Sequence, residues 1–173
     1  MSFFTNLRAD RLIAEIKAAD DSDGHKSSLE KLVRLGASAI PRILDALASA
    51  DNRETAGSVA VLTALLANNS FPAVASGLTQ GNQRTVAGAA TALSNSRNYP
   101  ANLLFGLLDQ PAMPKGTVVG ILTAQKSRLN ARDVLQRAYN QDAAEKAAMF
   151  RIVSEIADAS IVPELLSRLE GKD

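Results

Sequence analysis

The chain has 173 residues, of which 46% are hydrophobic and 4% aromatic, and its formal net charge is +1. It contains no cysteine and a single histidine, His25, predicted to lie on the surface, which excludes disulfide bonds, thiolate zinc sites, a cysteine nucleophile and any site built on several imidazoles. The near-neutral charge, and the short length of the longest low-polarity stretch (58–67), predict a cytoplasmic protein that neither spans a membrane nor attracts nucleic acid through its overall field.

The first predicted element is a helix over 3–18. Its apolar residues recur at helical spacing, at Phe3, Phe4, Leu7, Leu12, Ile13 and Ile16. We predict that this helix caps the first of the repeats that follow, so that 1–23 forms a cap helix and an acidic turn. A helix that binds a partner or lies on a membrane surface is the alternative.

The acidic turn Asp20–Gly24 has some features of a calcium-binding loop. With Gly24 at the sixth position, Asp21, Asp23 and Glu30 fall at the third, fifth and twelfth. However, Ala19 takes the first position, where such a loop needs a carboxylate. We therefore predict no metal site, and expect an Asp or Ser of the turn to cap a helix that begins near Lys26.

A motif of about thirty residues repeats along the rest of the chain. One copy is 38–47, SAIPRILDAL, and others lie at 70–78, 98–108 and 160–169. The motif's prolines are Pro41, Pro72, Pro100 and Pro163, and Ala131 replaces proline in a fifth copy, which gives spacings of 31, 28, 31 and 32. Because proline fits the first turn of a helix and leucines follow on one face, each copy predicts a short proline-led helix.

Longer helices of the same period are predicted between the short ones. Each opens with a basic residue, and these are Arg53, Arg84, Lys115 and Lys146. Interior glycines cost about 1 kcal/mol each relative to alanine, so we expect close backbone approach at Gly57, Gly88, Gly106 and Gly120. The prediction is one all-α domain, 1–173, with five antiparallel hairpins at 24–50, 51–80, 81–110, 111–140 and 141–170. A compact bundle with a coincidental period is the alternative.

The segment 32–47, LVRLGASAIPRILDAL, resembles the HEAT repeat, especially the bacterial variety similar to phycobilisome-lyase repeats. A leucine–glycine pair ends one helix, a proline-led helix follows, and the turn 51–54 resembles the one that opens the next unit. The resemblance covers about residues 25–170. It implies a right-handed α-solenoid, or superhelix, whose proline-led helices line a concave face that binds proteins. It leaves open whether the array continues beyond Asp173.

The resemblance also bears on enzyme classes. The iron-dependent hydroxylases of this architecture use repeated His-Glu pairs, which are absent here. The HEAT-like DNA glycosylases use aromatic and acidic residues in a basic groove, whereas this chain has no Trp and is nearly neutral. We predict a non-catalytic scaffold that binds a partner protein and holds no cofactor. A chromophore enzyme of the lyase type is the least favoured alternative.

Charge is unevenly distributed among the repeats. Residues 1–50 carry seven positive and seven negative groups, unit 111–140 carries +4 and unit 141–170 carries −3. The polar residues of the fourth proline-led helix are Arg132, Asp133, Gln136 and Arg137, which we predict to contact a partner. They also support the alternative of a nucleic-acid or phosphate-binding module. Simple pairing between the fourth and fifth units is the structural alternative.

The second repeat is unusual because no charged residue occurs from Thr55 to Gln83. Exposed surfaces normally carry charges, so a partner or a second copy of the chain is predicted to cover part of this unit. The candidate contacts are Phe71, Val74, Ser76, Thr79 and Gln80. The alternative is that uncharged polar residues alone keep this face soluble.

Overall fold

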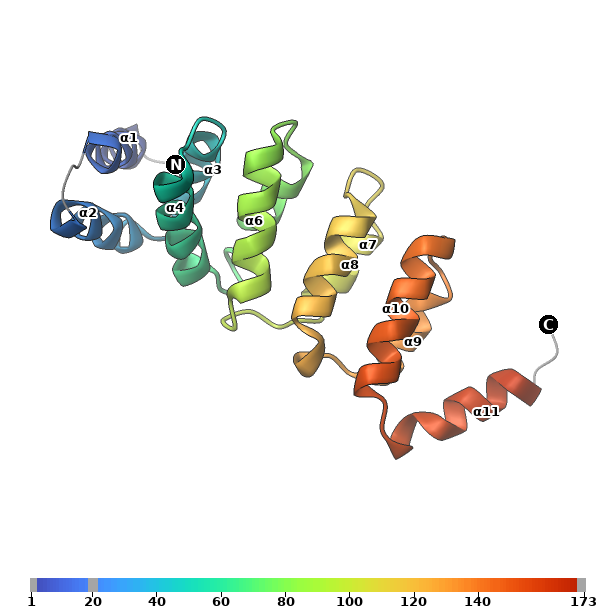
Figure 1. The fold of residues 1–173 in the computed structure, drawn as a ribbon. Coiled ribbons are helices and arrows are strands. Elements are labelled where there is room, and N and C mark those ends of the chain that lie inside the picture. The colour runs from blue at the N-terminus through green and yellow to red at the C-terminus, as the bar shows by residue number, and fades with distance from the viewer. Residues whose placement is uncertain (1–2, 19–21, 171–173) are drawn as a thin grey trace. The chain divides into compact units, whose positions relative to one another are not determined.

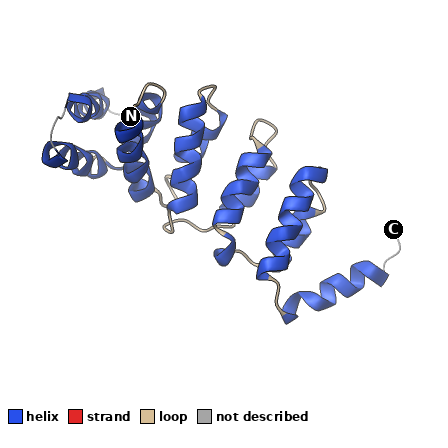
Figure 2. Cartoon of the chain, in the orientation of Figure 1, coloured by secondary structure: helices blue, strands red, loops and turns tan. Residues whose placement is uncertain are grey.

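The computed structural model describes residues 3–18 and 22–170, without the side chains of residues 3, 22, 25 and 168–170. Every regular element in these residues is helical (Figure 2). The prediction of an all-α chain is confirmed. Within the described ranges, no helix combines the length and the apolarity needed to cross a bilayer. The chain divides into two compact units, Met1–Pro100 and Ala101–Asp173.

The helices of the first unit pack in two rows (Figure 1). The elements are α1 (Phe3–Ala18), α2 (Ser22–Arg34), η1 (Gly36–Ala39), α3 (Ile40–Leu47), α4 (Asn52–Leu65), α5 (Phe71–Ala75), η2 (Ser76–Thr79) and α6 (Gln83–Asn95). In one row α4 packs between α2 and α6, and in the other α3 packs between α1 and α5. The helix predicted to cap the first repeat, α1, lies against α2, η1 and α3.

The second unit repeats the alternation of longer and shorter helices. Its elements are α7 (Leu103–Leu108), α8 (Lys115–Ala124), η3 (Lys126–Arg128), α9 (Ala131–Ala138), α10 (Ala143–Ile156), η4 (Ala159–Ile161) and α11 (Val162–Glu170). Helix α8 packs against α7 and α10, and α9 packs against α10. Aliphatic residues fill the interior between these helices, among them Leu104, Ile121 and Leu122.

Short polar side chains cap the starts of α4, α6 and α9. The Asp51 carboxylate accepts a hydrogen bond from the backbone N–H of Glu54 (2.8 Å), and the Glu54 carboxylate accepts one from the backbone N–H of Asp51 (3.1 Å). This capping box satisfies two donors at the start of α4 that have no partner inside the helix. Asn82 and Asn130 accept in the same way at the starts of α6 and α9.

The side chains that open α6 also hold the end of α3. Arg84 Nη1 donates to the carbonyl of Ala50 (2.9 Å), and the Thr85 hydroxyl donates to the carbonyl of Leu44 (3.2 Å). Leu44 lies in the last turn of α3, whose carbonyls lack partners within the helix, so the bond from Thr85 satisfies one of them, while Arg84 holds the chain just after the helix. The basic residue that recurs at the start of a long helix therefore has a structural role at Arg84.

The start of α7 differs from the prediction at Pro100. The helix begins at Leu103, and Pro100 lies exposed in the preceding turn. The residue before Pro100, Tyr99, is 1% exposed and is packed within the first unit. Its hydroxyl donates to the Leu93 carbonyl (2.6 Å), and its ring lies 5.1 Å from that of Phe71 between centroids.

We expect Tyr99→Phe to lower the free energy of unfolding by about 1–2 kcal/mol, because the buried Leu93 carbonyl loses its donor while the ring contact with Phe71 remains. Urea denaturation followed by circular dichroism measures the change. Thr91→Val serves as the control, because the Thr91 hydroxyl is exposed and bonds only within its own helix. A Tyr99→Phe variant no less stable than this control would contradict the assigned role.

The acidic turn also differs from the prediction. Helix α2 begins at Ser22, so Asp23 and Gly24 belong to its first turn and not to a loop that ends near Lys26. Asp20 and Asp21, and the side chain of His25, lie outside the described residues. An acidic residue in the first turn is favourable because it faces the positive end of the helix dipole.

The interior glycines divide into two kinds. A Cβ on Gly88 would lie 2.8 Å from a methyl carbon of Leu47, so this glycine makes room for a side chain and not, as predicted, for a second backbone. A Cβ on Gly106 or Gly120 would meet nothing within 4 Å, so the prediction is wrong at these two positions. Gly57 is buried in α4, as a packing role requires.

Candidate functional site

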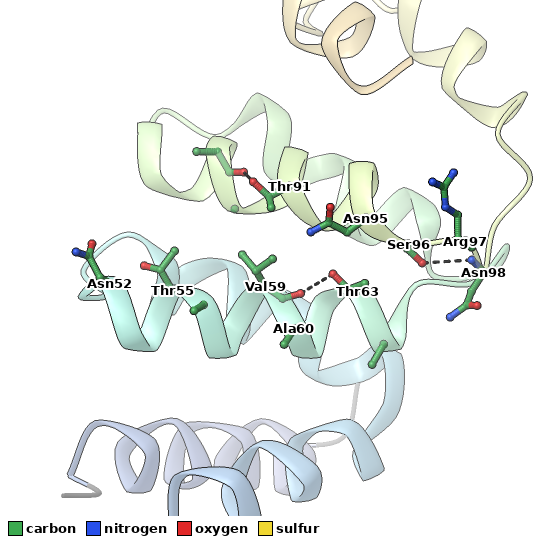
Figure 3. Close-up of a pocket in the computed structure, with 14 residues that line it drawn as sticks. Asn52, Thr55, Val59, Ala60, Thr63, Thr91, Asn95, Ser96, Arg97 and Asn98 are labelled. Carbon is green, nitrogen blue, oxygen red and sulfur yellow. Dashed lines mark hydrogen bonds between the residues drawn. The ribbon is translucent and has the colours of Figure 1, made fainter. Parts of the chain in front are cut away.

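A groove of about 1030 Å³ runs along α4 and α6 in the first unit (Figure 3). Small residues form its walls: Ala56, Val59, Ala60 and Ala64 on α4, and Ala87 and Gly88 on α6. Ala60, Ala64 and Ala87 are exposed, and Val59 is half-buried. Short side chains on two adjacent helices leave the space between the helices open, which is why a groove forms here.

Polar groups without charge lie along the groove. Asn52 and Thr55 mark one end, and Arg97 and Asn98 mark the other (Figure 3). The hydroxyls of Thr63 and Thr91 donate to the carbonyls four residues earlier in their own helices, at 2.7 and 2.8 Å. Their oxygens retain acceptor capacity, and the asparagine amides can both donate and accept. The groove therefore offers hydrogen bonds next to apolar surface.

Arg97 is the one ionisable residue among those that line the groove. It lies in the exposed turn after α6, beside Ser96 and Asn98 (Figure 3). The Ser96 hydroxyl accepts from the backbone N–H of Asn98 (3.3 Å), which fixes the course of this turn. A ligand that carries a carboxylate at this end of the groove would meet a guanidinium.

A comparison of α4 with α10 shows that this surface is not a generic solvated helix face. Both helices have 14 residues. At equivalent positions counted from their N-cap residues, α4 has Ala60 and Ala64 where α10 has Arg151 and Glu155. All four are exposed. The same architecture thus accepts charges at these positions, and α4 has exposed methyl groups there instead.

The site residues predicted in the second repeat are only partly on the surface. Phe71 and Val74 are 5% and 0% exposed, so they belong to the core and cannot form a contact surface. They are buried because α5 packs against both α3 and α6. Ser76 and Thr79 are exposed, but the Ser76 hydroxyl donates to the Ala73 carbonyl of α5 and the Thr79 hydroxyl to the Ser76 carbonyl, while Gln80 is half-buried.

The residues predicted in the fourth repeat form pairs. Arg137 Nη1 donates to both carboxylate oxygens of Asp109, at 2.8 and 2.6 Å, and Arg132 donates to the Ser160 carbonyl (3.4 Å). Asp133 and Gln136 are exposed on the same helix. These contacts use up much of the hydrogen-bonding capacity that a partner or a phosphate would need.

Other basic residues of this repeat are paired with the fifth. Lys115 lies 3.8 Å from an Asp142 carboxylate oxygen, and Lys126 donates to Glu155. The Arg128 guanidinium donates to the side-chain oxygen of Gln125, which is itself buried (2.9 Å). The pairing between repeats that the sequence analysis held as an alternative is thus present at Lys115 and Lys126.

The uncharged stretch noted in the sequence includes part of the groove of α4 and α6. Its α4 wall lies inside the uncharged stretch 55–83, but the predicted contacts were placed on the following short helix. The sequence pattern that could have indicated the groove is alanine at every fourth position, at Ala56, Ala60 and Ala64. This spacing places the three exposed alanines on one face of α4. Alanine at such positions is also the commonest residue of a good helix, which hides the pattern.

Within the residues that the structure describes, no cluster of three or more His, Asp or Glu side chains could hold a metal ion. Asp158 has a pKa below its ordinary value because the Ser160 hydroxyl and backbone N–H donate to its carboxylate. It caps the start of η4, in the second unit. Comparison with protein families, curated proteins and solved structures gave no match for this chain.

Proposed function

We propose that this chain is a non-catalytic scaffold whose groove along α4 and α6 binds an extended, mostly uncharged segment of a partner protein. The observation that carries the proposal is the exposed, uncharged alanine face at positions where the equivalent helix α10 has charged residues. Such a face is more costly to leave in water than a charged one, and a covering ligand removes that cost.

The polar lining favours an extended segment over a helix. An extended peptide has backbone N–H and C=O groups that need partners, and Asn52, Asn95 and Thr55 offer them along the groove. A helix of 14 residues such as α4 is about 20 Å long, which matches about six extended residues. A carboxylate at the Arg97 end would complete the complementarity.

The architecture that supports this function is, in our proposal, a right-handed solenoid of HEAT-like hairpins in the cytoplasm. Two findings support it: long helices pack next to long helices within each unit, and in the first unit the Thr85 hydroxyl of one repeat donates to the Leu44 carbonyl at the end of α3 in another. Stacks of this kind expose long surfaces suited to protein binding. The groove lies on the long helices, whereas the resemblance implies binding through the proline-led ones.

Nucleic-acid or phosphate binding through the fourth repeat gains no support from the side-chain contacts. Lys115, Lys126 and Arg137 each form an ion pair with a carboxylate. An anionic ligand would therefore compete with these carboxylates for the same side chains.

The test is a selection of peptides from a displayed library against the whole chain, followed by affinity measurements on the Ala60→Arg/Ala64→Glu variant. This variant places the α10 side chains on α4, so the helix should keep its stability. We expect the selected peptides to have an uncharged core with an acidic group at one end, and to bind the variant at least about tenfold more weakly, a loss of about 1.4 kcal/mol. Arg151→Ala on α10 is the matched control and should bind as the unaltered chain does.

Peptides that bind the variant and the unaltered chain equally would overturn the proposal. Sedimentation of the unaltered chain tests whether a second copy of the chain, and not a partner segment, fills the groove. Concentration-dependent dimers that disappear in the Ala60→Arg/Ala64→Glu variant would show that a second copy fills the groove, and would replace the partner segment proposed here.

A further inference from the structure

A second groove, of about 350 Å³, lies between α1 and α2. Its lining residues are Arg8, Arg11, Leu12 and Glu15 of α1, together with Lys31, Arg34 and the following Leu35. The two helices pack against each other, and the Ser28 hydroxyl reaches the Glu15 carboxylate (3.5 Å). The groove thus belongs entirely to the first unit and is separate from the groove of α4 and α6.

Positive charge dominates this groove. Four of its lining residues are basic and one is acidic. Glu15 accepts from Arg11 Nε (3.0 Å), which neutralises one of the four. Among the described residues, Arg8, Lys31 and Arg34 form no ion pair. Asp10, the other acidic residue of α1, does not line the groove and pairs with Arg42 (3.5 Å).

Helix stability explains only part of this cluster. Lys31 and Arg34 lie in the last turn of α2, where positive charge favours the negative end of the helix dipole. Arg8 and Arg11 occupy the middle of α1 and gain nothing from that dipole. Like charges that line one groove repel one another, and an anionic ligand would turn this repulsion into attraction.

Apolar surface accompanies the charge. Leu12 and Leu35 are half-buried in the lining. On α1, Phe4 and Leu7 are 73% and 57% exposed, and with Arg8 and Arg11 they have the spacing of one helix face. A free anion would use the charges alone. A ligand that has carboxylates next to apolar side chains would use both.

We propose that the groove of α1 and α2 binds an acidic segment of a partner protein that also carries leucine or phenylalanine. The carboxylates pair with Arg8, Lys31 and Arg34, and an apolar side chain enters between the helices onto Leu12 and Leu35. The concave shape favours a protein segment over a flat bilayer, whose surface cannot follow a groove between two helices. This binding does not depend on the groove of α4 and α6.

The probe is a fluorescently labelled peptide in which glutamate pairs alternate with leucine or phenylalanine, and fluorescence anisotropy with the whole chain measures its Kd. We expect binding that weakens as salt is added, because the pairs are exposed. The charge reversal Arg8→Glu/Arg34→Glu should weaken it at least about tenfold. Lys26→Glu/Arg151→Glu, which makes the same change of net charge outside the groove, should leave the Kd within about twofold.

Three outcomes would overturn the proposal. Equal loss in both double variants would show that net charge alone attracts the peptide. Tighter binding to phosphatidylserine vesicles or to a single-stranded oligonucleotide would assign the surface to a membrane or a nucleic acid. A peptide with serine in place of leucine and phenylalanine that binds equally well would remove the apolar contact. The Ala60→Arg/Ala64→Glu variant should bind the acidic peptide normally, so this test and that of the proposed function can fail separately.

Discussion

Leu62→Asp should unfold the first unit under conditions in which the unaltered chain is folded. Leu62 is 0% exposed in the last turn of α4, so the new carboxylate would be buried without a partner. Neutralising or exposing such a group costs at least about 4 kcal/mol, which is a large part of the stability of a domain of this size. Leu104→Asp places the same charge at a 0% exposed position of α7 and should do the same to the second unit.

Urea denaturation followed by circular dichroism measures the effect, with Ala60→Asp as the control. Ala60 lies two positions earlier on α4 and is exposed, so the same introduced residue should cost only about 1 kcal/mol or less, mostly in helix propensity. If Leu62→Asp and Ala60→Asp had the same midpoint, the assignment of the buried face of α4 would be wrong.

Gly77→Ala should lower the free energy of unfolding by about 1–3 kcal/mol, whereas Gly120→Ala should raise it by up to about 1 kcal/mol. A Cβ on Gly77 would lie 2.8 Å from the Cβ of Ala89 and 2.8 Å from a methyl carbon of Leu44. The Leu44 methyl can rotate away, but the Cβ of Ala89 is fixed to the backbone of α6. The turn η2 would therefore have to move away from α6.

Gly120 is the matched control because it is exposed in the interior of α8 and a Cβ there meets nothing within 4 Å. Alanine at this position restricts the unfolded chain and suits the helix. Thermal and urea unfolding of both variants, compared with the unaltered chain, give the two signs. Changes of the same sign would mean that the packing of η2 against α6 is not tight enough to exclude a methyl group.

The periodicity of the sequence determined the helices. Prolines in the first turn of α3, α5 and α11, and an alanine that begins α9, mark short helices because these positions depend on local backbone geometry. Apolar residues at helical spacing identified the core, and Leu62 and Leu104 are both 0% exposed. Local rules failed at Pro100, which follows the buried Tyr99 in the turn before α7.

Both candidate grooves depended on the tertiary structure. Residues 1–50 carry equal numbers of positive and negative groups, so their net charge conceals the four basic residues that line the groove of α1 and α2. The basic excess of the fourth repeat suggested a binding surface in the sequence. In the structure, however, Lys115, Lys126 and Arg137 of this repeat are paired with carboxylates. A sum over a segment counts charges without regard to which side chains face one another.

The sequence by itself determined that the chain is helical, where most of its helices begin, and which leucines are buried, because these properties depend on neighbours within one or two turns. Only the tertiary structure decided that Phe71 and Val74 are core residues while Ala60 and Ala64 line a groove. It also decided that Gly77 has no room for a methyl group whereas Gly120 does. These differences arise from contacts between helices of different repeats, and a helical period says which face is apolar but not how closely another helix approaches it.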